Sequence, residues 1–210
     1  MRVKICGLTR PEDVEDAVDA GADYLGFVFF PRSPRALSTV HGVTLMDAVP
    51  SGVLKVALTV DPDDALIDQL SELPVDFLQL HGHEAPERIS EIKSRSGLPV
   101  VKAVGISDVG DLVQIARYKS VADQILVDTK PPEGASRPGG NAVAFDWSLL
   151  TGFEWTLPWL LAGGLTSQNV GKAIRITGAQ QVDVSSDVES ALGIKDRDLM
   201  RNFISAAKAA

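Results

Sequence analysis

Residues 1–29, "MRVKICGLTRPEDVEDAVDAGADYLGFVF", contain two short apolar runs with a polar, helix-like segment between them. The first run, 3–6, is followed by Pro11, a residue favoured in the first turn of a helix, and Gly21 stands where that helix would end. The second run begins at Tyr24 and is apolar at nearly every position. Strands that are apolar on both faces and alternate with helices are typical of parallel sheets. This stretch therefore predicts a β-α-β unit.

The same unit recurs along the whole chain. Strands are predicted to begin at Val3, Tyr24, Val53, Phe77, Pro99, Gln124, Leu157 and Gln181. Helices are predicted over 11–20, 63–73, 86–96, 108–120, 167–177 and 196–210, with shorter helical segments over 43–49 and 145–150. Asp63 and Ser167 are expected to cap two of these helices, and Gly97 to end a third.

Eight such units predict a compact α/β protein, a closed (β/α)8 TIM barrel in a single domain spanning residues 1–210. The alternative is an open, doubly wound sheet. Eight strands of similar length favour closure, and no dinucleotide-binding glycine pattern follows the first strand.

The amino-acid composition limits which binding partners and which cellular compartment are expected. The 210 residues include 20 basic and 28 acidic side chains, for a net charge of −8, which disfavours nucleic acid and anionic lipid. No apolar run is long enough to span a membrane, and the amino terminus does not read as a secretory signal. The one cysteine excludes an internal disulfide and suits a reducing cytoplasm. We expect a cytoplasmic protein with a small-molecule substrate.

In a (β/α)8 barrel, function lies where strands end and the following loops begin. The only cysteine, Cys6, ends the first predicted strand, and Asp128 ends the sixth. Because side chains alternate along a strand, Lys4 should lie one layer below Cys6, and Asp183 one layer below Ser185. Each residue also has a plainer interpretation: a free cysteine packs as a small apolar side chain, and an aspartate often caps a helix.

The stretch "AGGLTSQN", 162–169, combines a strand end, two glycines and a helix start. Glycines allow close approach of a ligand to the backbone, and a helix N-terminus favours anions. Ser185 and Ser186 follow the next strand, and the loops after strands seven and eight often form a phosphate site in such barrels. Gly163, Gly164, Ser185 and Ser186 are therefore predicted to bind phosphate.

His81 and His83 of "HGHE" could be metal ligands, but no third partner follows in sequence, so no metal site is predicted. We expect His81 to line the barrel mouth instead.

Several segments together resemble the phosphoribosylanthranilate isomerase family of tryptophan biosynthesis. They are "VKICGLT", "GADYLGFVFFPRSPR", "LQLHG", "VVKAV", "LVDTK", "FDWSLL", "LAGGLTSQNV" and "VDVSS" followed after one residue by "VE", in order along nearly the whole chain. The resemblance implies a cofactor-independent Amadori rearrangement of N-(5′-phosphoribosyl)anthranilate. It also implies that Cys6 is the general base, Asp128 the general acid and Arg35 the ligand of the anthranilate carboxylate. Gly163, Gly164, Ser185 and Ser186 match its phosphate site, and Asp183 is a candidate contact for the sugar hydroxyls or an orienting residue.

This mechanism needs a thiolate beside a protonated carboxyl group, the reverse of their ordinary order of ionisation. In model compounds that reversal costs about 6 kcal/mol. Lys4, and secondly Lys102, are the candidate cations that would lower the pKa of Cys6; the alternative is that only a minor protonation state reacts.

The chain departs from the family pattern at three places. Asp187 replaces a glycine after the serine pair and is expected to point away from the phosphate, capping a short helix. Asn141 and Ala142 alter the loop after strand six, and Thr59 replaces an aromatic residue.

The residues are also compatible with two other functions. The chain could be another phosphosugar isomerase or epimerase on this barrel, or a catalytically silent barrel that binds a phosphorylated metabolite. The chain is expected to be a monomer or a homodimer.

Overall fold

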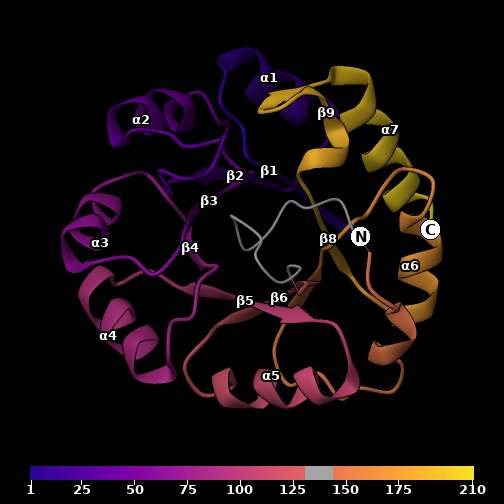
Figure 1. Ribbon diagram of the computed structural model, residues 1–210. Helices are drawn as coiled ribbons and strands as arrows, with labels where there is room; N and C mark the ends of the chain where they lie inside the picture. The colour runs from indigo at the N-terminus through magenta and orange to yellow at the C-terminus, as the bar shows by residue number, and fades with distance from the viewer. Residues whose placement is uncertain (131–143) are drawn as a thin grey trace.

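The computed structural model describes residues 1–130 and 144–210. Eight parallel strands close into a barrel in chain order, and helices surround it (Figure 1). The barrel strands are β1 (Arg2–Cys6), β2 (Tyr24–Val28), β3 (Leu54–Thr59), β4 (Phe77–Leu80), β5 (Val100–Ile106), β6 (Gln124–Thr129), β7 (Trp159–Leu161) and β8 (Gln181–Val184). The predicted fold is confirmed, and the open-sheet alternative is wrong because β8 pairs with β1.

Seven α-helices and three short 3-10 helices occur in the described part of the chain. The α-helices are α1 (Pro11–Asp19), α2 (Thr39–Asp47), α3 (Asp64–Ser71), α4 (Pro86–Ser96), α5 (Val113–Tyr118), α6 (Val170–Thr177) and α7 (Arg197–Lys208). The 3-10 helices are η1 (Val109–Leu112), η2 (Trp147–Leu150) and η3 (Ser186–Val188). None of the described helices is long and apolar enough to cross a membrane.

The helix ends follow local sequence chemistry. Asp63 accepts a hydrogen bond from the N–H of Leu66, 2.8 Å away, and so caps α3 as predicted. Pro11 occupies the first turn of α1, and Gly97 ends α4 with a left-handed φ of 68°. The predicted cap Ser167 is wrong: α6 begins at Val170, because Thr166 and Asn169 bond each other's backbone across the preceding turn.

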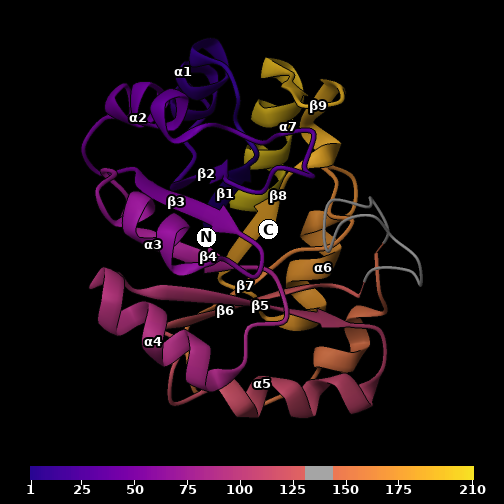
Figure 2. The same cartoon turned by 60° about the vertical axis from the view of Figure 1, so that its left-hand side comes forward.

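Two further predictions needed correction. The segment 145–150 forms the 3-10 helix η2 rather than an α-helix, and only the second half of 108–120 is α-helical. The sequence also gave no indication of a small antiparallel hairpin, β9 (Glu189–Ala191) and β10 (Ile194–Lys195), which Figure 2 shows beside α7. A turn at Gly193, with φ of 81°, separates its strands.

The barrel interior is divided between an apolar side and a polar side. Strands β5, β6 and β7 point small and branched apolar side chains inward, and Phe77 of β4 packs against them. The members of this cluster are Val101, Ala103, Leu126, Leu160 and Ala162. At the seam between β1 and β8 the interior is charged, since Lys4 and Asp183 are register partners and form an ion pair of 2.8 Å.

The apolar side of the interior should be sensitive to lost volume. Leu126→Ala is expected to lower the free energy of unfolding by about 2–5 kcal/mol, because Leu126 is fully buried and its neighbours are held by the closed sheet. Urea denaturation measures this change. The matched control Leu192→Ala, at a leucine 65% exposed, should cost less than about 0.5 kcal/mol. Equal losses in the two variants would contradict the close packing of Leu126 inside the barrel.

Candidate active site

Cys6 ends β1 at the carboxyl end of the barrel, with its side chain on the same inward face as Lys4. It is buried, and the register partner on β2 is Gly26. A Cβ atom on Gly26 would lie only 2.8 Å from the Cys6 sulfur. The glycine therefore makes the space that the thiol occupies.

Burial and neighbouring cations act on the pKa of Cys6 in opposite directions. Burial is the largest influence and raises the pKa of Cys6 above its ordinary value, while Lys4 and, more weakly, Lys195 act to lower it. Lys4 is confirmed as a neighbouring cation, but desolvation outweighs its effect, and this favours the alternative in which a minor protonation state reacts. Although burial opposes it, Asp183 and Cys6 raise the pKa of Lys4 itself to about 12, so this side chain stays charged.

Lys102 was expected as a second cation for Cys6, and this is wrong. Its ammonium group bonds Glu84 at 2.6 Å and the carbonyl oxygens of Leu80 and Gly82, and it lies 5.6 Å from the ring centroid of Tyr118 on α5. It faces away from Ala103 and Val101, which point into the barrel. Lys102 therefore links β5 to the loop after β4 and does not act on the pKa of Cys6.

Asp128 lies near the carboxyl end of β6, buried and on the same inward face as Leu126. Its Oδ1 accepts a hydrogen bond of 2.7 Å from the N–H of Thr129, and its Oδ2 lies 3.3 Å from Nε2 of His81. A Cβ atom on Gly163 would lie 3.0 Å from Oδ1 and 2.6 Å from the Thr129 nitrogen. The glycine thus lets the loop after β7 pass directly beside this carboxyl group.

The two glycines after β7 have left-handed backbone conformations, with φ of 82° at Gly163 and 60° at Gly164. Neither of their N–H groups has an acceptor within the described residues. Asn169 fixes the loop by donating from Nδ2 to the carbonyl oxygen of Gly164 at 2.9 Å. Two adjacent unpaired N–H groups in a fixed loop can bind an anion.

The serines after β8 lie beside β1. The Ser185 hydroxyl donates to the carbonyl oxygen of Cys6 at 3.0 Å, and Nζ of Lys195 donates to the Ser185 carbonyl oxygen at 2.8 Å. Asp187 is the middle residue of η3, whose N-cap position belongs to Ser185, so the expected capping role is wrong. Burial raises the pKa of Asp187 above its ordinary value.

Arg35 reaches the mouth but is already paired. Its Nε and Nη2 donate to the two carboxylate oxygens of Glu189 at 2.6 and 2.8 Å, and its side chain is 4% exposed. Lys195 bonds the same carboxylate at 2.8 Å. Arg35 Nη1 keeps no hydrogen-bond partner within the described residues. Sequence reasoning assigned no role to Glu189 or Lys195, since only the unpredicted hairpin brings them to Arg35.

The two histidines of "HGHE" lie in different environments. His81 contacts Asp128, whereas the His83 side chain is 96% exposed and lies 3.6 Å from Asp61. Thr59, another departure, is buried and donates to the carbonyl oxygen of Phe29 at 3.3 Å. The altered loop positions Asn141 and Ala142 fall outside the described residues.

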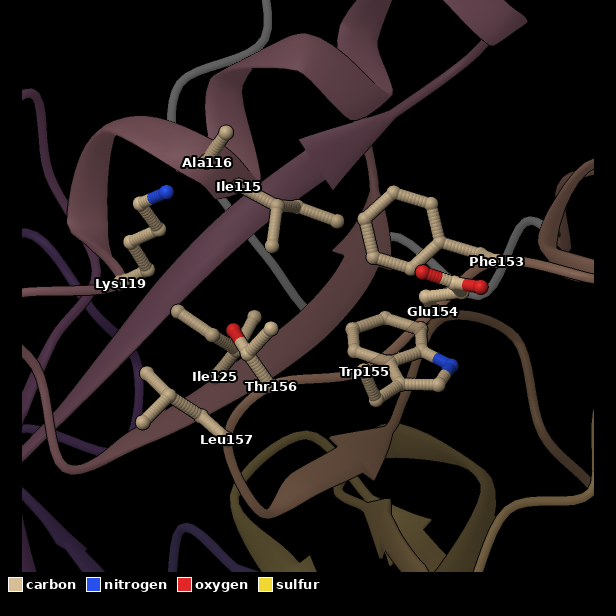
Figure 3. A pocket seen from close by; sticks show the side chains of 9 residues that line it. All are labelled: Ile115, Ala116, Lys119, Ile125, Phe153, Glu154, Trp155, Thr156 and Leu157. Carbon is tan, nitrogen blue, oxygen red and sulfur yellow. The ribbon is translucent and has the colours of Figure 1, made fainter.

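A separate pocket lies at the other end of the barrel, between α5 and the segment that leads into β7 (Figure 3). Ile115, Ile125 and Leu157 form an apolar wall, and Trp155 stacks on Trp159 with ring centroids 4.0 Å apart. It is remote from the strand carboxyl ends, so the acid and base candidates do not line it.

Thiol, carboxyl group and unpaired N–H groups at the carboxyl ends of one barrel define an enzyme of the (β/α)8 class that is suited to proton transfer on an anionic substrate. The family described as "N-(5'phosphoribosyl)anthranilate (PRA) isomerase" matches residues 3–206. The chain belongs to this family.

Individual relatives agree over the full length. An N-(5'-phosphoribosyl)anthranilate isomerase from Cereibacter sphaeroides is 55% identical over 209 residues, covering 99% of each chain. The crystal structure of the Thermotoga maritima enzyme is 38% identical, with a TM-score of 0.88 and complete coverage of both chains. A crystal structure of the isomerase in complex with reduced 1-(o-carboxyphenylamino)-1-deoxyribulose 5-phosphate is 36% identical, with a TM-score of 0.85 and complete coverage.

Removing the charge of Lys4 should make the Cys6 thiolate harder to form. In Lys4→Met the midpoint of thiolate formation, followed by its ultraviolet absorbance, should move to higher pH, because the cation that lowers the pKa of Cys6 most strongly is lost. The single cysteine makes the signal unambiguous.

Lys4→Met also leaves Asp183 buried without its partner, so Lys4→Met/Asp183→Asn provides a variant without an unpaired charge. It should shift the midpoint in the same direction by a smaller amount. The control Lys119→Met, at an exposed lysine, should not shift it. An unchanged or lower midpoint in both Lys4 variants would contradict the assignment.

Proposed function

We propose that the chain converts N-(5′-phosphoribosyl)anthranilate to 1-(2-carboxyphenylamino)-1-deoxyribulose 5-phosphate with Cys6 as general base and Asp128 as general acid. Membership of the family makes it an isomerase of tryptophan biosynthesis. The observation that supports the roles is the placement of both groups on inward faces at the carboxyl ends of β1 and β6.

The reaction needs two proton transfers. Asp128 protonates the ring oxygen, the bond from that oxygen to C1′ breaks, and the anthranilate nitrogen supplies the electrons as an iminium forms. Cys6 then removes the proton from C2′ to give an enolamine, which tautomerises to the ketose. Holding the ribose between the two groups lowers the barrier by orientation.

The protonation states follow from burial. Because the pKa of Cys6 is raised, most of the resting enzyme holds a neutral thiol, and a minor thiolate fraction performs the abstraction. Lys4 stays charged one layer below and reduces the cost of forming that thiolate. This supports the alternative in which a minor protonation state reacts.

Anion-binding groups at both ends would hold the substrate. The N–H groups of Gly163 and Gly164, with Ser185 and Ser186, would bind the phosphate. The free Nη1 of Arg35 would bind the anthranilate carboxylate while Glu189 fixes the guanidinium plane. Asp183, paired with Lys4, would orient the base or meet a sugar hydroxyl.

The compartment and the oligomeric state are part of this proposal. A working thiol requires a reducing environment, so we place the enzyme in the cytoplasm. The substrate is a phosphorylated small molecule, and all the groups assigned to it come from one chain, so a monomer or a homodimer could serve equally.

Cys6→Ser and Asp128→Asn should each lower kcat by about 100- to 10,000-fold while substrate binding is retained, because each removes a proton-transfer group. Loss of the fluorescence of freshly generated phosphoribosylanthranilate measures turnover. Asp47→Asn, at an exposed carboxylate at the end of α2, is the control and should match wild type. Wild-type turnover in either active-site variant would remove that residue from the mechanism.

Arg35→Met should raise KM by about 10- to 100-fold, because a charge-assisted hydrogen bond to the anthranilate carboxylate is lost. Glu189→Gln keeps the guanidinium and should raise KM much less. If both substitutions change KM equally, Arg35 acts through the Glu189 pair and does not bind substrate.

A further inference from the structure

Phe77 and then Gln79 point inward from β4, and His81 follows directly after the strand, at the mouth of the barrel. Gln79 is completely buried in the barrel. Its Nε2 lies 3.0 Å from Nδ1 of His81, and Nε2 of His81 lies 3.3 Å from Oδ2 of Asp128. A continuous line of polar contacts thus runs from a buried amide to the proposed acid.

His81 reaches Asp128 across an intervening strand, since β5 lies between β4 and β6. The inward positions of β5 at this level are Ala103 and Gly105, and Gly105 is the register partner of Asp128. Neither position carries a side chain larger than a methyl group. A Cβ atom on Gly105 would lie 3.1 Å from the Cα atom of Lys130, which follows β6.

The orientation of the Gln79 amide determines which ring nitrogen of a neutral His81 carries the proton. With its NH2 group donating to Nδ1, the neutral imidazole carries its proton on Nε2 and donates it toward the Asp128 carboxylate. With the amide reversed, Nδ1–H would donate to Oε1, and Nε2 would accept a proton from a protonated Asp128. In the observed orientation Oε1 is buried without a partner among the described residues.

We propose that Gln79 is a positioning residue whose amide holds His81 in the Nε2–H tautomer and thereby sets the hydrogen bond that Asp128 receives. The tautomer is inferred from the amide nitrogen that faces Nδ1 of His81, whereas its effect on turnover rests on the proposed role of Asp128. A carboxylate that accepts from both Thr129 N–H and His81 is fixed in orientation, as an acid must be once it has given up its proton.

Nitrogen-15 NMR of histidine-labelled protein tests the tautomer. The chain has only 3 histidines, and His81→Asn assigns the relevant signal. Wild type should show His81 with its proton on Nε2. Gln79→Glu presents an acceptor to Nδ1 and should move the proton there, while Gln79→Met, which cannot bond the ring, should give a mixture. The control Gln180→Glu, at an exposed glutamine before β8, should leave the signal unchanged.

Kinetics test the link to Asp128. Gln79→Met should lower kcat about 10-fold with KM within about twofold, and should have no further effect in an Asp128→Asn background. Identical His81 signals in wild type, Gln79→Glu and Gln79→Met would overturn the proposal. If the tautomer moves as expected while kcat does not change, the His81 hydrogen bond does not affect turnover and the catalytic part of the proposal is overturned, whereas the role of Asp128 is tested separately by Asp128→Asn.

Discussion

The ion pair between Lys4 and Asp183 lies on the seam where the sheet closes. The two residues are 179 positions apart, yet they are direct partners in the register of β1 and β8. Both are buried, so each needs the other: removing one partner of such a pair costs about 3–5 kcal/mol, although the pair itself can add little net stability. The pair thus joins the first and last strands of the barrel, and it places a cation below Cys6.

Other buried cations follow the same rule of local neutralisation. Lys102 is paired with Glu84 outside the strands, and Lys195 shares Glu189 with Arg35 beside the mouth. The second group has two cations and one anion. That excess of positive charge lies where Ser185 and Cys6 meet, on the side of the barrel at which an anionic substrate is expected.

The fold could be predicted from the sequence because the β-α units carry local features that mark their elements. These features are apolar runs, first-turn prolines and glycines at helix ends. The inward direction of Lys4, Cys6, Asp128 and Asp183 also followed from strand alternation alone. What the sequence could not supply were pairings between distant segments. The partner of Arg35 comes from a hairpin of two very short strands, and whether burial or Lys4 dominates at Cys6 depends on how tightly the thiol is enclosed. The outward direction of Lys102 was missed, although the alternation that places Val101 and Ala103 inward implies it.

The seam between β1 and β8 also has a consequence during protein synthesis. Because a chain is synthesised from its amino terminus, Cys6 is made 179 residues before Ser185, whose hydroxyl bonds the Cys6 carbonyl oxygen, and the hairpin follows later still. Until then the nascent chain carries an open sulfhydryl in water. Barrel closure shelters this sulfur from oxidants, so slow translation or delayed folding would extend the period in which the enzyme is open to chemical damage.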